Sequence, residues 1–454
     1  MTGPLKLPPG PVQGRVNQLL RYSFRPLEFL EACAANYGDT FTLRLAGLGT
    51  LVQLTRPEDI RQVFKGASTV LHAGESNALL SSVVGDTSVL VLDEKQHVRQ
   101  RKIMLPPLKG ERMLTFFDAM QSEALAIADR WTGAGLVRAD QAMQTVTLRV
   151  ILRASLGLEP GPEFDLMQEN MGRLLRHIRH PLALVMWNLF PLSRYENSHV
   201  LPFYRMRRKF NAQLFAYFAR LRALDHERRP ECLLKDLLAT TYDDGSRMTD
   251  RELRDAIVTV LAAGHDTTAL ALAWAFELIL AQPEVVARIE AELEEVAGGA
   301  LPGIEQMPQL RYLDAVVRES VRVRNVIPFV ARVVKADFPV GGFAYPKNVV
   351  LCPSIHLLHM REDLYPEPRT FRPERFLERK FAPHEWIPFG GGNRACIGQA
   401  LAIYEMKVVL ATLFSSLRMQ RPANAVSRPV RRGVSIGPSD GTLLRVVERR
   451  RLKT

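Results

Sequence analysis

Residues 389–398 read Phe-Gly-Gly-Gly-Asn-Arg-Ala-Cys-Ile-Gly, in the spacing Phe-x-x-Gly-x-Arg-x-Cys-x-Gly. Glycines permit tight turns and let backbone N–H groups approach a sulfur atom closely. Cys396 lies where a helical pattern begins, at about residues 397–417, and a helix N-terminus stabilises negative charge. A single cysteine is more often an inert core thiol. The surrounding pattern instead predicts a loop that holds the cysteine as a thiolate.

The composition excludes several classes of protein. The chain has 454 residues, of which 47% are hydrophobic and 24% charged, as in ordinary soluble globular proteins. With 29 glycines and 29 prolines it is neither collagen-like nor broadly disordered. Four cysteines are too few for a disulfide scaffold, so we expect a cytoplasmic protein. Residues 1–22 contain no apolar segment, and we expect neither a signal peptide nor a transmembrane anchor.

The formal net charge is +12, which suits an acidic partner or an anionic surface. Basic runs occur at residues 205–209 and 445–453, and such runs are usually solvated faces. The basic residues are not interleaved with aromatic ones in the manner of a nucleic-acid-binding module, and we expect no nucleic-acid partner.

The periodicity predicts a mainly α-helical protein with a minor β region. Alternating patterns at residues 38–54 and 324–354 predict short strands, and helical patterns cover most of residues 57–297. The sequence contains no internal repeat and no Ser/Gly-rich linker. We therefore expect an N-terminal lead-in at residues 1–25, a single domain at 26–443 and a basic C-terminal tail at 444–454.

A long helix is predicted in the centre of the chain. Thr249 and Glu252 have the spacing of a capping box, and Pro283 ends the helical pattern. Residues 250–281 would span about 48 Å at ~1.5 Å per residue. Gly264 and the threonines after it weaken the middle of this helix. The weak point predicts a local opening beside a ligand, or else an ordinary polar patch at a helix contact.

The cysteine pattern of residues 389–398 resembles that of the cytochrome P450 family of haem-thiolate monooxygenases. Other family motifs follow in the expected order over about residues 30–443. The resemblance implies the cytochrome P450 fold, with haem b between the long central helix and the Cys-loop helix and with Cys396 as the axial thiolate ligand of the iron. It also implies that Phe389 packs against the sulfur, that Gly398 permits close backbone approach, and that Arg394 pairs with a haem propionate.

Two further segments resemble propionate-binding parts of the family. His97 and Arg101 lie four residues apart in a helical pattern, and Arg332 follows Pro328 in a β-like run. Two buried propionates carry about two negative charges and need several cationic donors. Each of these residues taken alone is equally compatible with a surface charge.

Glu319 and Arg322 lie three residues apart on a helical pattern at residues 310–323, and a chance pair of this kind is usually a weak surface ion pair. In the family, a Glu-x-x-Arg pair joins an arginine from a Pro-Glu-Arg-Phe segment, which is present here with Arg375. The resemblance therefore implies a structural triad that holds the region before Cys396.

Residues 263–268 match the motif of the family's central helix. The resemblance implies that Gly264 leaves room for dioxygen, that Thr267 hydrogen-bonds the oxygen or a nearby water, and that Asp266 feeds protons from solvent. His265 falls at a variable position and receives no role. The pairs His177/His180 and His356/His359 have a spacing that could suit a metal, but we favour surface or haem-edge roles because no third ligand is near in sequence.

The resemblance also implies a substrate and partners. The expected pocket draws on mostly apolar segments, which favours a lipophilic small molecule such as a fatty acid, terpenoid or steroid. Dioxygen is the co-substrate. Electrons would come from a ferredoxin or flavodoxin with its NAD(P)H reductase, docked on basic residues. The expected pocket segments are 71–91, 182–187, 260–263, 327–331 and 436–439, and the expected docking residues are Arg372, Arg379, Lys380 and Lys407.

Two alternatives stay open at this stage. One is a haem-thiolate peroxygenase or isomerase that does not activate dioxygen reductively, against which Asp266 and Thr267 argue. The other is a non-enzymatic carrier of lipophilic molecules, which leaves Cys396 and its glycines unexplained.

Overall fold

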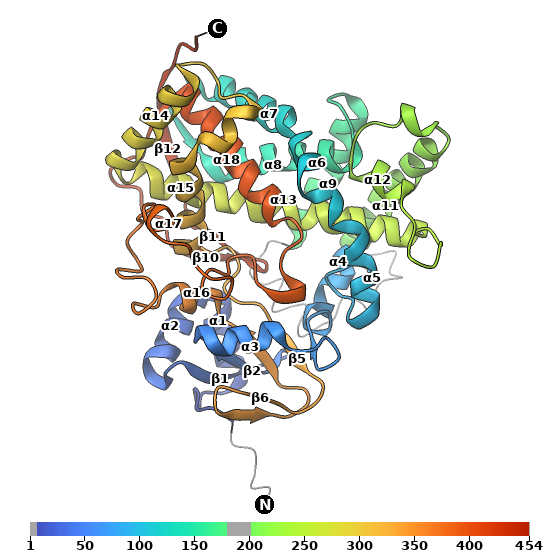
Figure 1. Cartoon of the computed structure of the whole chain (residues 1–454), viewed down its shortest axis with the longest axis vertical. Coiled ribbons are helices and arrows are strands. Elements are labelled where there is room, and N and C mark those ends of the chain that lie inside the picture. Colours follow the sequence, from blue (N-terminus) through green and yellow to red (C-terminus); the bar gives the residue numbers. More distant parts are fainter. Residues whose placement is uncertain (1–6, 179–200, 454) are drawn as a thin grey trace, which may run out of the picture.

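The computed structural model describes residues 7–178 and 201–453 (Figure 1). Helices form most of the molecule, and a smaller β region lies at the end from which the N-terminus emerges. The prediction of a mainly α-helical fold with a minor β region is confirmed. The helices of ten or more residues are α1 (Arg15–Phe24), α2 (Pro26–Tyr37), α5 (Glu94–Met104), α7 (Phe117–Trp131), α8 (Ala139–Leu156), α9 (Pro162–Ile178), α11 (Pro202–Arg222), α13 (Asp250–Leu280), α14 (Pro283–Ala297), α15 (Arg311–Val323) and α18 (Gln399–Ser416).

Shorter helices connect these elements. They are α3 (Pro57–Lys65), α4 (Ser81–Val84), α6 (Glu111–Leu114), α12 (Leu233–Ala239), α16 (Ile355–His359) and α17 (Arg375–Glu378), with single-turn or two-turn 3₁₀ segments that include η1 (Glu75–Leu80) and η6 (Gly392–Arg394). The largest sheet has the strand order β1-β2-β8-β5-β3, and only its β2–β8 pair is parallel. Its strands are β1 (Thr40–Leu45), β2 (Gly49–Leu54), β3 (Leu71–His72), β5 (Arg332–Val334) and β8 (Val350–Pro353).

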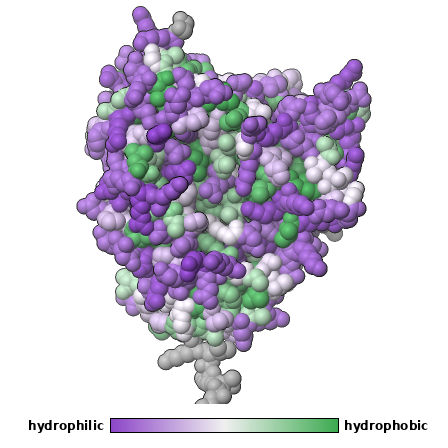
Figure 2. Space-filling model, viewed as in Figure 1, coloured by the Kyte–Doolittle hydropathy of each residue, from purple (hydrophilic) through white to green (hydrophobic). Residues whose placement is uncertain are grey.

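Three small sheets complete the β structure. The hairpin β6 (Phe338–Val340) and β7 (Phe343–Tyr345) lies beside the large sheet, and β10 (Pro429–Arg432) pairs with β11 (Ser435–Pro438). The third sheet has the order β4-β12-β9, formed by β4 (Leu136–Arg138), β12 (Leu443–Arg449) and β9 (Leu417–Gln420). Figure 2 shows a mainly hydrophilic face on which apolar groups gather in separate small areas.

The central helix α13 begins as the sequence predicts. The Thr249 Oγ1 accepts a hydrogen bond from the Glu252 N–H at 3.2 Å, and the Glu252 Oε2 accepts one from the Thr249 N–H at 2.8 Å. The helix then runs without interruption for 31 residues to Leu280. Among the described helices it alone is long and apolar enough to cross a membrane, yet 72% of that window is buried inside the protein. It is therefore a core helix, and its backbone does not open at Gly264.

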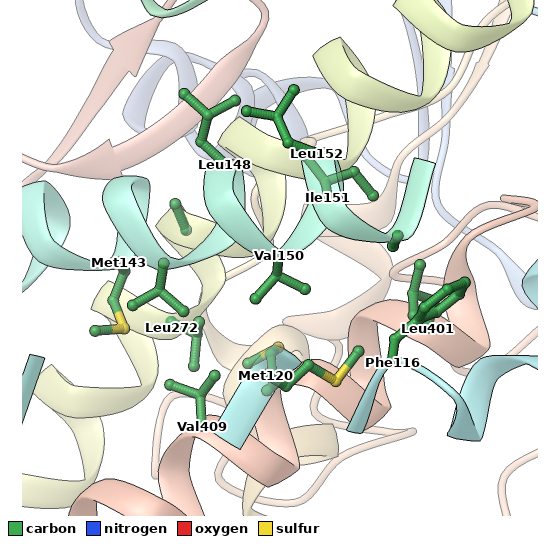
Figure 3. Packing of buried hydrophobic residues seen from close by; sticks show 14 of the residues in the cluster. Phe116, Met120, Met143, Leu148, Val150, Ile151, Leu152, Leu272, Leu401 and Val409 are labelled. Atoms are coloured by element: carbon green, nitrogen blue, oxygen red, sulfur yellow. The ribbon is translucent and has the colours of Figure 1, made fainter. Parts of the chain in front are cut away.

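The core surrounds α13, which contacts α8, α15, α18 and β11. Figure 3 shows apolar side chains of four helices meeting in this core: Met143, Val150 and Ile151 of α8, Leu272 of α13, Met120 of α7, and Leu401 and Val409 of α18. Because close-packed interiors hold their elements in one arrangement, the start of α18 has a defined position relative to α13.

The segments expected as a lead-in and as a tail contain helix α1 and strand β12, which pack onto the rest of the fold. Helix α1 buries Leu19 and Tyr22, and β12 is the central strand of its sheet. Residues 444–449 are therefore a strand rather than a tail, and residues 15–24 are a packed helix rather than a lead-in. Both segments are held by partners distant in sequence, which local patterns do not show.

A buried ion cluster ties α15 to the segment before the cysteine loop. The Glu319 carboxylate accepts from Arg322 Nε at 2.6 Å and Nη2 at 2.7 Å, and from Arg375 Nε at 3.1 Å. All three side chains are at most 3% exposed. The remaining donors reach backbone carbonyls, of His359 at 2.8 Å from Arg322 and of Glu367 at 2.9 Å from Arg375. The cluster thereby fixes residues 359–375 against α15.

We predict that Glu319→Gln lowers the free energy of unfolding by about 3–5 kcal/mol, because it leaves two arginines buried without a counter-charge. Urea denaturation followed by circular dichroism measures this loss. Glu163→Gln is the control, since Glu163 forms an exposed pair with Arg220 at 2.6 Å. That control should cost less than about 1 kcal/mol. Equal losses in the two variants would contradict a stabilising role of the buried cluster.

Candidate active site

The loop before α18 presents Cys396 to a hollow in the protein. Gly390 and Gly392 adopt positive φ values of 68° and 66°, which a residue with a side chain rarely adopts. The Cys396 N–H donates to the Phe389 carbonyl at 2.9 Å and closes the loop. The thiol is accessible, whereas Cys33, Cys232 and Cys352 are buried. Protein atoms nevertheless crowd the Cys396 sulfur on most sides, and both properties together place it in the wall of a concave site.

The surroundings of the sulfur do not by themselves favour a thiolate. Burial raises the pKa of the Cys396 thiol, while the Gly398 backbone N–H and the positive charge of Arg101 act in the opposite direction. A coordinated metal cation deprotonates a thiol outright. The loop therefore fits a sulfur that becomes an anion by binding a metal.

Positive groups gather beside the sulfur with little compensating charge. Burial and the charge of Arg394 lower the pKa of Arg332 to about 10, and burial also lowers the pKa of Arg394 to about 10. Burial, Arg394, Arg101 and Arg332 together lower the pKa of His97 to about 3. These four side chains are the ones that the sequence assigned to propionate binding. Helix α5 supplies His97 and Arg101, β5 supplies Arg332, and the cysteine loop supplies Arg394.

The polar atoms of this cluster remain only partly satisfied. Arg332 is buried, and its guanidinium donates to the Ala331 carbonyl at 2.8 Å. Among the described residues Arg101 has no carboxylate partner, and the buried Nδ1 atom of His97 has no hydrogen-bond partner. Buried cations without counter-charges are costly, so the cluster fits a ligand with anionic groups such as the two propionates of haem b.

Arg394 has partners of its own. It donates to Asp93 Oδ1 at 2.5 Å and to the Leu92 carbonyl at 2.6 Å. Asp93 also accepts from the backbone N–H groups of Gly74 and Glu75, each at 2.8 Å. Sequence reasoning missed Asp93, since nothing local to it indicates a partner 301 residues away. Its carboxylate positions Arg394 at the edge of the site.

Asp93 ends a segment, residues 87–93, whose first residues are attached to α13. Thr87 donates from its N–H and its Oγ1 to Asp255 Oδ2, at 2.9 and 2.7 Å, and Ser88 Oγ lies 2.6 Å from Thr259 Oγ1. Residues 87–93 thus span from the central helix to the cysteine loop. This link gives the two helices expected on either side of the haem a common anchor.

The middle of α13 borders open space at one position. Ala263 is exposed, although residues 253–261 and 268–279 on either side are buried. Thr267 Oγ1 donates to the Ala263 carbonyl at 2.6 Å. The expected pocket segment 260–263 includes Ala263, and the structure leaves Ala263 exposed while Val260 and Leu261 are buried. Ala263 thus exposes a small surface, and the Thr267 hydroxyl lies beside it.

Gly264 faces helix α8. A Cβ atom built on it would come within 3.2 Å of Ile151 Cδ1 on α8, so the glycine permits close packing of α8 on α13. The exposed position in this part of α13 is Ala263, whereas Gly264 faces α8, because adjacent helical residues point about 100° apart. Asp266 is half-buried on the same helix.

His265 is buried on the α8 side of the helix, where its Nδ1 lies 3.0 Å from Thr147 Oγ1. It reaches the wall of an open cavity of about 420 Å³ between α8 and α9. The lining is mostly polar, unlike the apolar pocket expected for the substrate. The other described residues of that lining are Gln141, Gln144, Thr145, Leu148, Asp165, Gln168, Glu169, Gly172 and Arg176.

Several other expected residues lie away from the cysteine. Lys407 is buried, so it cannot contribute to a docking surface as expected. Arg372 and Arg379 are engaged by Glu378 and Glu385, at 2.5 and 2.9 Å. His356 pairs with Glu31 at 2.7 Å, and the Nε2 of buried His359 accepts from the Ile387 N–H at 3.1 Å. Within residues 7–178 and 201–453 no cluster of three or more His, Cys, Asp or Glu side chains could hold a metal ion.

The expected pocket segment at residues 182–187 lies outside the described residues, as do His180 and the side chain of His177.

Comparison with known proteins agrees with this site. A family model described as Cytochrome P450 matches residues 4–444. Cytochrome P450 135B1 of Mycobacterium tuberculosis is 34% identical over 449 residues, covering 98% of this chain and 92% of that protein. Cytochrome P450 138 of the same species is 32% identical over 453 residues, covering 98% and 97%. Neither name states a substrate.

A solved structure shows the same fold. Retinoic acid-bound cyanobacterial CYP120A1 has a TM-score of 0.85 to this chain at 22% identity, covering 98% of this chain and 99% of that one. With the accessible cysteine in its glycine loop and the anion-requiring cluster beside it, the chain belongs to the cytochrome P450 family and is a monooxygenase whose cofactor is cysteine-ligated haem b.

Proposed function

We propose that the protein hydroxylates or epoxidises a lipophilic small molecule, such as a fatty acid, a terpenoid or a steroid, with dioxygen and two electrons supplied by a partner. The observation that carries this proposal is the exposed Ala263 surface with the Thr267 hydroxyl beside it, in the middle of a helix whose flanking residues 253–261 and 268–279 are buried. An apolar segment at residues 326–330 supports a lipophilic substrate, since its side chains are half-buried beside all three apolar clusters.

Each site residue has a role in this proposal. When bound, haem b supplies the oxygen-activating chemistry. Cys396 ligates its iron, with Phe389 and Gly398 beside the sulfur. His97, Arg101, Arg332 and Arg394 hold the propionates.

The residues of α13 would manage protons and water. The Thr267 hydroxyl holds a water or an oxygen atom by a hydrogen bond, and half-buried Asp266 exchanges protons with solvent. Glu319, Arg322 and Arg375 keep the cysteine loop in place without contacting the reacting atoms.

A ferredoxin or flavodoxin with its NAD(P)H reductase is the proposed electron source. The net charge of +12 favours an acidic partner. Of the four basic residues expected at the docking face, Lys380 is exposed and has no ion pair among the described residues. It is therefore the residue of that set best able to attract such a partner.

A peroxygenase or isomerase is the second candidate, since it would use the same haem site. Thr267 and Asp266 favour reductive oxygen activation instead, because they provide a hydroxyl and an acid beside the exposed Ala263 in the middle of the central helix. A non-enzymatic carrier would have no use for an accessible cysteine beside uncompensated cations.

We predict that Cys396→Ser abolishes the long-wavelength absorption band of the reduced, carbon-monoxide-bound protein and lowers turnover at least about 100-fold, because a serine hydroxyl does not supply the thiolate charge. Cys33→Ser is the matched control, since Cys33 is buried in α2 away from the site, and it should keep both properties. Retention of the band in Cys396→Ser would exclude this sulfur as the ligand.

Thr267→Ala should lower the product formed per NAD(P)H consumed at least about tenfold, because proton delivery loses its hydroxyl. Thr412→Ala is the control, since Thr412 makes the same i−4 hydrogen bond, at 2.7 Å, within α18. The measurement compares product with NAD(P)H oxidation in the reconstituted system. If coupling stays intact in Thr267→Ala, the peroxygenase or isomerase candidate replaces reductive oxygen activation.

Reduction of the protein by an acidic ferredoxin should slow about tenfold from low salt to about 0.5 M salt, because exposed charges are screened. Lys380→Glu should slow it at low salt, whereas Lys209→Glu, on the exposed face of α11, should not. Stopped-flow absorbance measures the rate. A rate independent of salt would remove charge-steered docking from the proposal.

A further inference from the structure

Helix α1 presents apolar side chains to solvent at a regular spacing. Val16, Leu20 and Phe24 are 61%, 43% and 54% exposed, and Val12 just before the helix is 97% exposed. Side chains four residues apart lie on one face of a helix. We call these four residues the α1 stripe. The opposite face of α1 buries Leu19 and Tyr22 against the rest of the protein. The helix therefore has two apolar faces, and the face with the α1 stripe is exposed to solvent.

Helix α1 and the residues that flank it up to residue 27 carry charges of one sign only. The first 27 residues of the chain contain no Asp or Glu, and α1 and its end carry Arg15, Arg21 and Arg25. Among the described residues Arg15 and Arg21 have no carboxylate partner, and Arg25 has only an exposed pair with Glu28 at 3.7 Å. The surface of α1 is therefore both apolar and cationic.

Two arginines of the C-terminal basic run differ in this respect. At the C-terminal end, Arg449 pairs with Asp129 and Arg450 with Glu290. Their charge is compensated within the protein, whereas that of α1 is available to an external partner.

The inner face of α1 is firmly attached. The Tyr22 ring lies 5.9 Å from that of Phe329, and the Arg431 guanidinium lies 4.2 Å from the Tyr22 ring centre. Gln18 accepts from the Arg44 N–H at 2.9 Å and donates to the Gln13 carbonyl at 2.7 Å. The stripe is therefore preformed. Since Phe329 belongs to the apolar segment 326–330, α1 lies one side chain away from a segment of the proposed substrate pocket.

We propose that α1 docks the protein on the surface of an anionic lipid bilayer. The α1 stripe enters the region between headgroups and acyl chains, and Arg15, Arg21 and Arg25 bind lipid phosphates. A helix with an apolar face and flanking arginines lies in this interface, and its binding combines apolar burial with attraction to anionic lipids. A second copy of the chain is disfavoured as the occupant, because it would bring like charges together. Docking would bring the apolar segment 326–330 toward the phase in which lipophilic molecules collect.

The first test is sedimentation of the haem-loaded full-length protein with vesicles, at low salt. Vesicles of phosphatidylcholine and phosphatidylglycerol at a 3:1 ratio should bind the protein, and vesicles of phosphatidylcholine alone should bind it at least tenfold more weakly. The variant Val16→Ser/Leu20→Ser/Phe24→Ser should lose at least tenfold in partition coefficient. Leu136→Ser/Val426→Ser/Val447→Ser is the matched control, since these residues are 54%, 66% and 50% exposed elsewhere, and it should bind normally.

The second test asks whether vesicle binding depends on the arginines of α1 or only on the net charge of the protein. Arg15→Glu/Arg21→Glu should weaken binding to the anionic vesicles at least tenfold, and Arg205→Glu/Lys209→Glu, which changes the net charge equally on exposed positions of α11, should weaken it far less. Normal absorption spectra would show that all variants hold haem.

The proposal is overturned if the protein does not bind the anionic vesicles, or if both members of a variant pair bind alike. It is also overturned if the α1 variant binds normally but changes the sedimentation coefficient of the protein without lipid, which would assign α1 to contact with a second copy. Because binding is measured without substrate or electron donor, failure of this proposal leaves the proposed reaction untouched.

Discussion

The negative charge on one sulfur atom is the constraint on which the site depends. Cys396 is crowded by protein, and burial raises the pKa of its thiol. A thiolate there requires a metal cation in contact with it and backbone N–H groups near it. The glycine turns at 390 and 392 and the N-terminal end of α18 meet the second requirement. The loop is thus a binding site that becomes electrostatically stable when haem iron occupies it.

The surrounding structure positions this loop from two directions. The buried cluster of Glu319, Arg322 and Arg375 attaches the preceding segment to α15. Residues 87–93 connect α13 to Arg394 through Asp255 and Asp93. In the first cluster one carboxylate neutralises part of the charge of two arginines, and backbone carbonyls accept from their remaining donors. Beside the cysteine the cations have less compensation, which fits an anionic ligand. The same residue types therefore serve stability in one place and cofactor binding in the other, according to their partners.

Particular residues show how far sequence reasoning reaches. The capping box of Thr249 and Glu252 was predictable because both partners lie within one helical turn. The motif around Cys396 could be recognised because its five fixed positions lie within ten consecutive residues and resemble the pattern of the family. Lys407 was placed incorrectly, since its burial depends on helices that pack from elsewhere in the chain. The contact of Gly264 with Ile151 was not predictable for the same reason.

The sequence by itself determined the family, the helical class, the cysteine ligand and the central helix, because each depends on residues close together along the chain. Only the tertiary structure decided that Asp93 holds Arg394, that Ala263 borders the open part of α13, and that residues 444–449 form the centre of a sheet. It also decided that one side of α1 stays uncovered. These features depend on contacts between segments tens to hundreds of residues apart, and such contacts are selected by packing of the whole chain rather than by local pattern.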